Sequence, residues 1–351
     1  MMKSERDYNC IVKFSGRIRG LFFIMFVAAA VMCLAACGGN QGKEASGGNA
    51  DKEASGTGVY FDTVVDIKIV APNADELLQG CFDLCQEAEM TLSAQLEESE
   101  LYQLNHRTEQ SVEVSEELAE CIARGIECGE LSGGLFDITV LPLRELWDFE
   151  AEDPHVPAQE DIDAALQKVD YRKVHVEGNR VIFDDPETQI DLGGIAKGDI
   201  SKMLKNWLEE QGAEAALINL GGNVSVLGTK PDGSEWNVGI QEPFADRGTI
   251  LEVVPVKSGC VISSGTYERY FEQDGKDYHH ILDPGTGWPV ETDLQQASVL
   301  GEDDVLCDAF STICILAGQE EAIRLAEDNA LDVRILFVGE DHEGVWYPQE
   351  D

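Results

Sequence analysis

The order of strand-like and helix-like segments most strongly limits how this chain can fold. Stretches rich in Val, Ile and aromatic residues predict strands, and apolar residues spaced three and four positions apart predict helices. Strand and helix segments do not alternate regularly, which favours an α+β fold with mixed or antiparallel sheets flanked by helices over a doubly wound sheet. The expected strands are 59–70, the two strands of a hairpin at 173–183, 215–220, several between 224 and 262, and 333–338. The expected helices are those capped by Asn73 and Ser115, the segment 201–210, and 303–329.

Composition divides the chain into three parts. Residues 59–351 contain no stretch typical of an interdomain linker, and the 43% hydrophobic content of the chain is enough for one substantial core, so we expect a single folded unit there. Residues 37–58 consist mainly of Gly, Ser, Ala and charged residues, with KEASG occurring twice, which predicts a flexible tether. Residues 1–36 have the features of an export signal.

The export segment is basic at first and continues into the apolar run LFFIMFVAAAVM (21–32), which is short for a membrane-spanning helix. It ends in LAAC (34–37), which resembles the lipobox of a bacterial lipoprotein and implies cleavage before Cys37 and lipidation of its thiol. The alternative is an ordinary signal peptide with an incidental cysteine. We therefore expect an exported protein anchored to the outer face of the cytoplasmic membrane.

Charge and cysteine content exclude several classes of protein. The formal net charge of −42 disfavours binding to nucleic acid, and it makes a divalent cation a natural intermediary for an anionic ligand. Seven cysteines lie outside the export segment, and none has the C-x-x-C spacing of a zinc site. Cys81 and Cys85 fall on one apolar helical stripe, which predicts buried, hydrophobic roles.

The segment IDLGGIAKGD (190–199) joins an expected strand to an expected helix. Backbone N–H groups at such a helix start attract anions, Lys197 adds positive charge, and Gly194 lets the backbone come close enough for its carbonyl to reach a cation. A plain strand-to-helix turn is the alternative. Asp191 lies at the end of the strand, and Asp199 is predicted to be a solvent-facing acid in the first turn of the helix.

Two further segments carry groups that a core does not need. In CDAFSTI (307–313), Asp308 and Thr312 are four residues apart, so on a helix their oxygens share one face and suit Mg²⁺, although such pairs often only cap or solvate a helix. In HHILDPGTG (279–287), neighbouring histidines point to opposite faces of an extended chain. One of them can then act as a general base, whereas a surface turn is the alternative.

Taken in order, the motifs resemble the ApbE family of exported FAD:protein FMN transferases. They span nearly all of the unit 59–351, which the resemblance implies is a single ApbE-like catalytic unit. The resemblance implies an enzyme that binds FAD, uses Mg²⁺ to cleave the pyrophosphate, attaches FMN through a phosphoester to a Thr or Ser of a partner protein, and releases AMP. The matching motifs are GGLFDIT with PL and WDF (133–149), DLGGIAKG (191–198), NLGGN (219–223), SGTYERYF (264–271), HHILDPGTGWP (279–289) and DAFST (308–312).

The resemblance also implies roles for individual residues. His280 matches the base that acts on the acceptor hydroxyl, Ser311 lies at a variable metal position, and the other matches fall into two groups. The cofactor contacts are Leu135, Phe136, Asp137, Asp191, Lys197 and Leu282, and the metal ligands are the Gly194 carbonyl and the side chains of Asp308 and Thr312.

Two positions depart from the family pattern. The usual Met-Gly-Thr is Phe61-Asp62-Thr63 here, where Phe61 could still cover an aromatic ring, and an expected Tyr is Gln95.

The sequence is compatible with three functions. Cleavage of a pyrophosphate requires charge neutralisation more than a covalent nucleophile, and a metal, a lysine and a base supply the necessary parts. The acceptor would be a membrane redox subunit or an exported flavoprotein. If water replaces the acceptor hydroxyl, the same site makes a Mg²⁺-dependent FAD pyrophosphatase, and without turnover the protein would be a flavin-binding lipoprotein.

Overall fold

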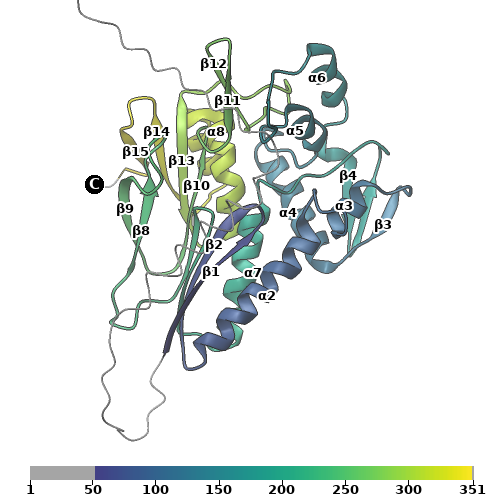
Figure 1. Cartoon of the computed structure of the whole chain (residues 1–351). Coiled ribbons are helices and arrows are strands. Elements are labelled where there is room, and N and C mark those ends of the chain that lie inside the picture. The colour runs from purple at the N-terminus through teal and green to yellow at the C-terminus, as the bar shows by residue number, and fades with distance from the viewer. Residues whose placement is uncertain (1–51, 350–351) are drawn as a thin grey trace, which may run out of the picture. The chain divides into compact units, whose positions relative to one another are not determined.

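An eight-stranded antiparallel sheet forms the centre of the fold in the computed structural model, which describes residues 52–349 (Figure 1). This architecture confirms the α+β expectation, because the strands pair antiparallel and the helices are gathered beside the sheet. In spatial order the strands are β1 (Lys52–Tyr60), β2 (Thr63–Ala71), β6 (Ala215–Leu220), β7 (Asn223–Leu227), β10 (Gly259–Gly265), β13 (Leu294–Gly301), β14 (Arg334–Gly339) and β15 (Gly344–Tyr347).

The two faces of the sheet are covered differently. Three long helices, α2 (Ala74–Leu92), α7 (Ala196–Glu210) and α8 (Asp304–Asp328), pack on one face, with α4 (Glu116–Leu131) beyond them (Figure 1). A two-stranded ribbon packs on the other face and is formed by β8 (Trp236–Gln241) and β9 (Ile250–Val256). Side chains alternate along each strand, so Ile262 of β10 joins the helical core and Val261 joins the ribbon core.

Smaller elements surround the helical side. A three-stranded sheet and a cluster of aromatic rings around Trp147 stabilise this region, and the hairpin β11–β12 lies at the top of the view in Figure 1. These elements are α3 (Glu100–Asn105), β3 (Ser111–Glu113), α5 (Leu141–Trp147), α6 (Gln159–Leu166), η2 (Tyr171–Lys173), β4 (Val174–Glu177), β5 (Arg180–Phe183), β11 (Tyr270–Gln273) and β12 (Lys276–His279).

The start of the fold differs from the expectation in two ways. The predicted tether 37–58 is wrong at its end, because Lys52 already pairs with Ala71 in the β1–β2 ladder. Ladder hydrogen bonds come from the backbone, so a Gly- and Ser-rich segment can supply them, and Gly56 packs closely against the ring of Phe82. The signal peptide 1–36, Cys37 and the tether up to residue 51 lie outside the described residues.

The expected strand 59–70 is divided by a tight turn. Phe61 and Asp62 both have φ of 54°, the left-handed conformation that a two-residue hairpin requires at its central positions. The hairpin joins Tyr60 to Thr63. Glycine, asparagine or aspartate normally occupies such positions, so Asp62 was the one turn residue here and Phe61 concealed the turn.

Helix caps, the edge of the central sheet and the cysteines can each be compared with their expected state. The Ser115 hydroxyl accepts from the Leu118 N–H and caps α4 as predicted, whereas Asn73 precedes α2 without a side-chain cap. The strand at 333–338 does not close the sheet, because β15 pairs outside it. All seven cysteines of the described part are free and buried, and the burial of Cys81 and Cys85 was expected. Residues 52–349 include no helix with the length and apolarity needed to cross a membrane.

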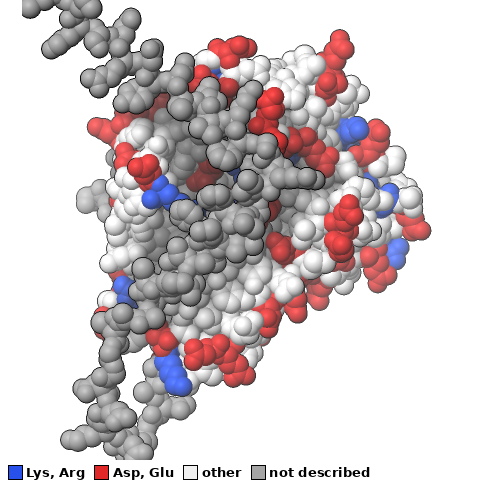
Figure 2. Space-filling model, viewed as in Figure 1, with Lys and Arg blue, Asp and Glu red and all other residues white. Residues whose placement is uncertain are grey.

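Acidic side chains are spread over the visible face of the molecule, with basic ones interspersed among them (Figure 2). On this face the acidic residues are therefore dispersed rather than gathered in one patch.

Candidate functional site

A cavity of about 990 Å³ lies at the end of the central sheet, beside the Gly221-Gly222 turn between β6 and β7. Its volume is at the upper end of the range of about 300–1,000 Å³ found for small-molecule sites. The structure brings together in its lining all the non-lipidation residues predicted for the site: Phe61, Leu135, Phe136, Asp137, Asp191, Gly194, Lys197, His280, Leu282, Asp308 and Thr312.

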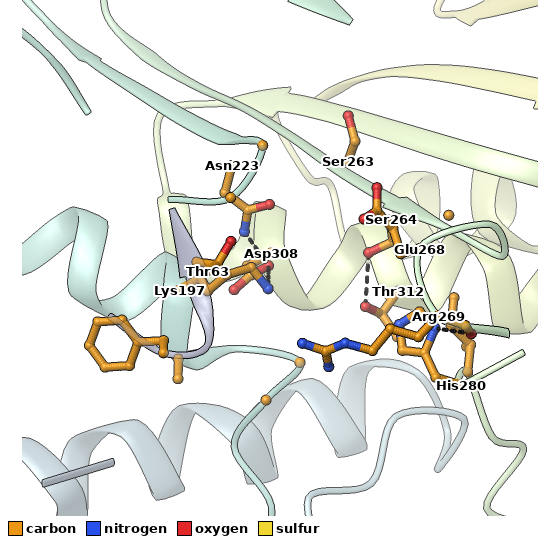
Figure 3. Close-up of a pocket in the computed structure, with 18 of the residues that line it drawn as sticks. Thr63, Lys197, Asn223, Ser263, Ser264, Glu268, Arg269, His280, Asp308 and Thr312 are labelled. Atoms are coloured by element: carbon orange, nitrogen blue, oxygen red, sulfur yellow. Dashed lines mark hydrogen bonds and ion pairs between the residues drawn. The ribbon is translucent and has the colours of Figure 1, made fainter. Parts of the chain in front are cut away.

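Asp308 lies at the inner wall of the cavity and is almost fully buried. Its Oδ2 accepts from the Gly198 N–H at 2.8 Å, and its Oδ1 accepts from the Asn223 amide at 2.8 Å (Figure 3). Burial raises the pKa of Asp308, while Lys197, whose Nζ lies 3.8 Å from Oδ1, opposes that shift. Two hydrogen-bond donors therefore fix the Asp308 carboxylate, and the positively charged Lys197 side chain lies near it.

The hydroxyl groups beside Asp308 have a defined hydrogen-bond direction. Ser311 donates to the Asp308 carbonyl at 2.8 Å, so the contact of 2.7 Å between Ser311 and Ser264 uses the Ser264 proton. Thr312, 3.1 Å from the same Ser264 oxygen, must then donate its own proton to that oxygen (Figure 3). The Thr312 lone pairs remain directed elsewhere, which is the state a cation ligand requires.

These oxygens fit a magnesium ion better than a softer metal. No group of three or more His, Cys, Asp or Glu side chains placed to hold a metal occurs within 52–349. A cation here would instead use the Asp308 carboxylate, the Thr312 hydroxyl and the Gly194 carbonyl, which are hard oxygen donors that leave room for phosphate oxygens. A Cβ at Gly194 would lie 2.9 Å from the Phe136 ring, so this position favours glycine.

His280 lies on the opposite side of Thr312 from Asp308 (Figure 3). Its backbone N–H donates to the Arg269 carbonyl at 3.0 Å, and its ring Nδ1 lies 3.3 Å from the same oxygen. A carbonyl only accepts, so Nδ1 carries the proton and Nε2 carries the lone pair. Desolvation, and then the positive charge of Arg269, lower the pKa of His280 to about 3, so the ring is neutral near pH 7.

The predicted cofactor contacts form another wall. Asp191 accepts from the Gly193 N–H at 2.8 Å and lies 3.3 Å from the Arg144 guanidinium. Asp137 is buried and its carboxylate accepts from Thr139 and from the Tyr171 N–H, so it braces the loop that presents Phe136. Burial raises the pKa of Asp137, and these hydrogen bonds oppose that effect.

The departures at Phe61 and Gln95 form part of the same wall. With its amide oriented to satisfy both neighbours, Gln95 donates to Asp62 at 3.2 Å and accepts from Arg144 at 2.5 Å. Together with Asp191, these side chains make a continuous polar network along the cavity. Phe61 lines the cavity from the strained hairpin turn.

Some expectations were wrong or incomplete. Asp199 does lie in the first turn of α7, but it is half-buried rather than solvent-facing, and desolvation raises its pKa to about 6. Sequence reasoning also missed Asn223, Ser264 and Arg144. Asn223 stood at the end of the quoted motif NLGGN, where a polar residue directly after a Gly-Gly turn was an available signal.

Comparison with known proteins adds an independent finding. Residues 61–337 match the sequence pattern of the ApbE family. The chain is 32% identical over 315 residues to a FAD:protein FMN transferase from Treponema pallidum, covering 85% of this chain and 87% of that protein. It is 34% identical over 260 residues to a FAD:protein FMN transferase from Klebsiella pneumoniae, covering 72% and 80% of the two chains.

Solved structures show the same relationship. The flavin transferase ApbE from Vibrio cholerae superposes with a TM-score of 0.76 at 28% identity, covering 85% of this chain and 97% of that one. The ApbE protein from Thermotoga maritima superposes with a TM-score of 0.77 at 30% identity, covering 84% and 96%.

Proposed function

This chain belongs to the ApbE family, and on that basis we propose that it is a FAD:protein FMN transferase that moves FMN from FAD to a Thr or Ser hydroxyl of a partner protein. The observation that carries this proposal is the arrangement of a fixed carboxylate, a lysine and a neutral histidine around one cavity large enough for a nucleotide.

The proposed reaction is a displacement at the FMN phosphorus. The acceptor oxygen forms the new P–O bond, the bond from that phosphorus to the bridging oxygen breaks, and AMP departs with the bridging oxygen. The acceptor proton passes to Nε2 of His280, whose lone pair is kept available by the Nδ1 contact with Arg269. Lys197 offsets the charge of the phosphates.

We propose Mg²⁺ as the resident cation. Asp308, Thr312 and the Gly194 carbonyl would hold it, and when bound it would neutralise charge on the pyrophosphate. The hydrogen-bond direction at Thr312 supports this assignment, since that side chain keeps its lone pairs for a cation.

The partner and the location are also proposals. The acceptor would be a membrane redox subunit or an exported flavoprotein, and lipidation at Cys37 would anchor the enzyme on the outer face of the cytoplasmic membrane. The support is the LAAC sequence after a short apolar run. Growth with a labelled fatty acid should mark the full-length protein and leave a Cys37→Ala variant unmarked.

The transferase activity can be tested directly. A chain beginning at Ala50, which contains every described element, is incubated with FAD, Mg²⁺ and a flavin-acceptor domain. Covalent flavin fluorescence should follow the acceptor through a denaturing gel, with AMP released in equal amount. Release of FMN and AMP at a rate unaffected by the acceptor would instead identify a pyrophosphatase, and recovery of intact FAD would identify a carrier.

The low pKa of His280 predicts a specific pH dependence. The His280 ring stays neutral at any pH well above 3. Protonation of His280 should therefore not lower kcat/KM for FAD as the pH falls from about 7.5 to 5. Replacement by glutamine should lower transfer by about 100- to 10,000-fold across that whole range. The assigned protonation state would be contradicted if kcat/KM fell below about pH 6.5 in the wild type but not in His280→Gln.

The same shift affects stability. The folded pKa lies below the ordinary value of 6.5, so the unfolded chain takes up the proton first as the pH falls. His280 therefore costs stability progressively from about pH 6.5 down toward pH 3. The unfolding midpoint of His280→Gln should accordingly decline less than that of the wild type over this window.

A further inference from the structure

A second buried carboxylate lies one helical turn before Asp308. Asp304 is 1% exposed at the start of α8, and it is not part of the cavity lining. The Lys205 ammonium lies 2.6 Å from its Oδ2, and the Ser225 hydroxyl donates to its Oδ1. Nothing in the proposed reaction uses this buried ion pair.

The contacts of Asp304 repeat those of Asp308. Asn223 and Ser225 are alternate residues of β7, so both point to the same face of the sheet, and each donates to one of the two carboxylates. Helix α7 supplies the other partner in each case, the Gly198 N–H for Asp308 and the Lys205 ammonium for Asp304. Helix α8 is therefore held at two successive turns by the same strand and the same helix.

Such an arrangement fixes orientation more than it adds stability. A buried ion pair loses much of its electrostatic gain to desolvation, so stability alone is a weak reason for having one. Asp304, Asp308 and Thr312 are spaced four residues apart and lie along one stripe of α8. Holding the first of them limits rotation of the helix, and rotation would turn the other two away from the cavity.

The pair also controls charge. Asp304 is a like charge one helical turn from Asp308. The Lys205 ammonium compensates the Asp304 charge locally, so the carboxylate at the cavity wall is not opposed by an uncompensated neighbour.

We propose that Lys205, Asp304 and Ser225 are positioning residues that orient α8 so that Asp308 and Thr312 can hold a divalent cation. This inference rests on the proposed function, because it takes those two side chains as cation ligands. None of these three residues lines the cavity, so they would act through Asp308 and Thr312.

The test uses Lys205→Met, which keeps the length of the side chain and removes its charge. Binding of Mn²⁺, used as the probe, is measured by electron paramagnetic resonance with FAD absent and present, and FMN transfer is measured separately. We expect the Mn²⁺ dissociation constant to rise by about 10- to 100-fold, as outer-sphere substitutions typically do. KM for FAD should change much less, and Lys205→Arg should restore most of the affinity because it keeps the positive charge.

A matched control is available on the same helix. Lys202 is exposed, so Lys202→Met makes the same chemical change without touching Asp304 and should leave Mn²⁺ binding unaltered. Ser225→Ala, which removes only one hydroxyl, tests the same idea by a milder change and should weaken Mn²⁺ binding in the same direction. It provides the answer if Lys205→Met does not fold.

The outcomes separate the two hypotheses. If Lys205→Met or Ser225→Ala lowers the unfolding temperature but binds Mn²⁺ and transfers FMN like the wild type, the residues are only structural and the inference is wrong. If the wild type binds Mn²⁺ but never labels an acceptor, the proposed function fails, while the loss of Mn²⁺ affinity in the variants would still support the positioning role.

Discussion

Replacing Asp308 with alanine should lower FMN transfer by about 1,000-fold or more, because the substitution removes the carboxylate expected to hold the cation at the pyrophosphate. FAD binding should fall much less, since the cavity wall formed by Phe136 and Asp191 is left intact. Single-turnover transfer gives the first quantity, and calorimetric titration with FAD in the presence of Mg²⁺ gives the second.

The control for this variant is Asp328→Ala. Asp328 is exposed at the other end of α8 and pairs only with Arg324 in the described contacts, so transfer by that variant should match the wild type. Normal turnover in Asp308→Ala would remove Asp308 from the cation role and would undermine the assignment of Thr312 with it.

Replacing Gly198 with alanine is the second change with a large expected effect. A Cβ there would lie 2.4 Å from the Asp304 carbonyl oxygen and 2.8 Å from the Asp308 Cβ. The carbonyl is helix backbone and cannot rotate away, so α7 and α8 must separate and the hydrogen bond from the Gly198 N–H to Asp308 is stretched or lost. We expect about 1–3 kcal/mol of lost stability, and about 100-fold slower transfer from the displaced carboxylate.

Gly193→Ala is the matched control for stability. It lies in the same glycine-rich segment, but a Cβ there would meet only the Asp191 carboxylate oxygen at 3.1 Å, which a small side-chain movement relieves. Chemical denaturation of both variants measures the difference. A Gly198→Ala protein with a wild-type unfolding midpoint and normal transfer would show that α7 and α8 are not in close contact at Gly198.

Much of the fold could be predicted because side-chain periodicity determines it. The stripe that includes Cys81 and Cys85 predicted α2, and the short apolar run 215–220 predicted β6. The β1–β2 hairpin was missed because its turn uses Phe61 where glycine, asparagine or aspartate is usual, and Asp62 alone is a weak signal. The start of β1 was missed because backbone pairing leaves little trace in composition.

The sequence predicted residues that line the site, but it did not predict the hydrogen bonds and ion pairs between them. Asp308 and Thr312 could be placed on one helical face by their spacing, and the order of the motifs identified the other segments. The Asn223 contact, the proton directions at Ser264 and the paired state of Asp304 depend on residues far apart in sequence. Only the packing of β7, α7 and α8 brings those groups together.

The seven buried cysteines allow unfolding of the domain to be followed by the alkylation of its native thiols. All of them belong to the one core between the sheet and its helices, and burial raises the pKa of Cys81, Cys85 and Cys128 to about 12. A thiol with so little thiolate at neutral pH reacts with alkylating reagents only when that core opens. Pulsed alkylation followed by mass spectrometry would therefore time the opening of α2, α4, β10 and α8 separately, without any introduced label.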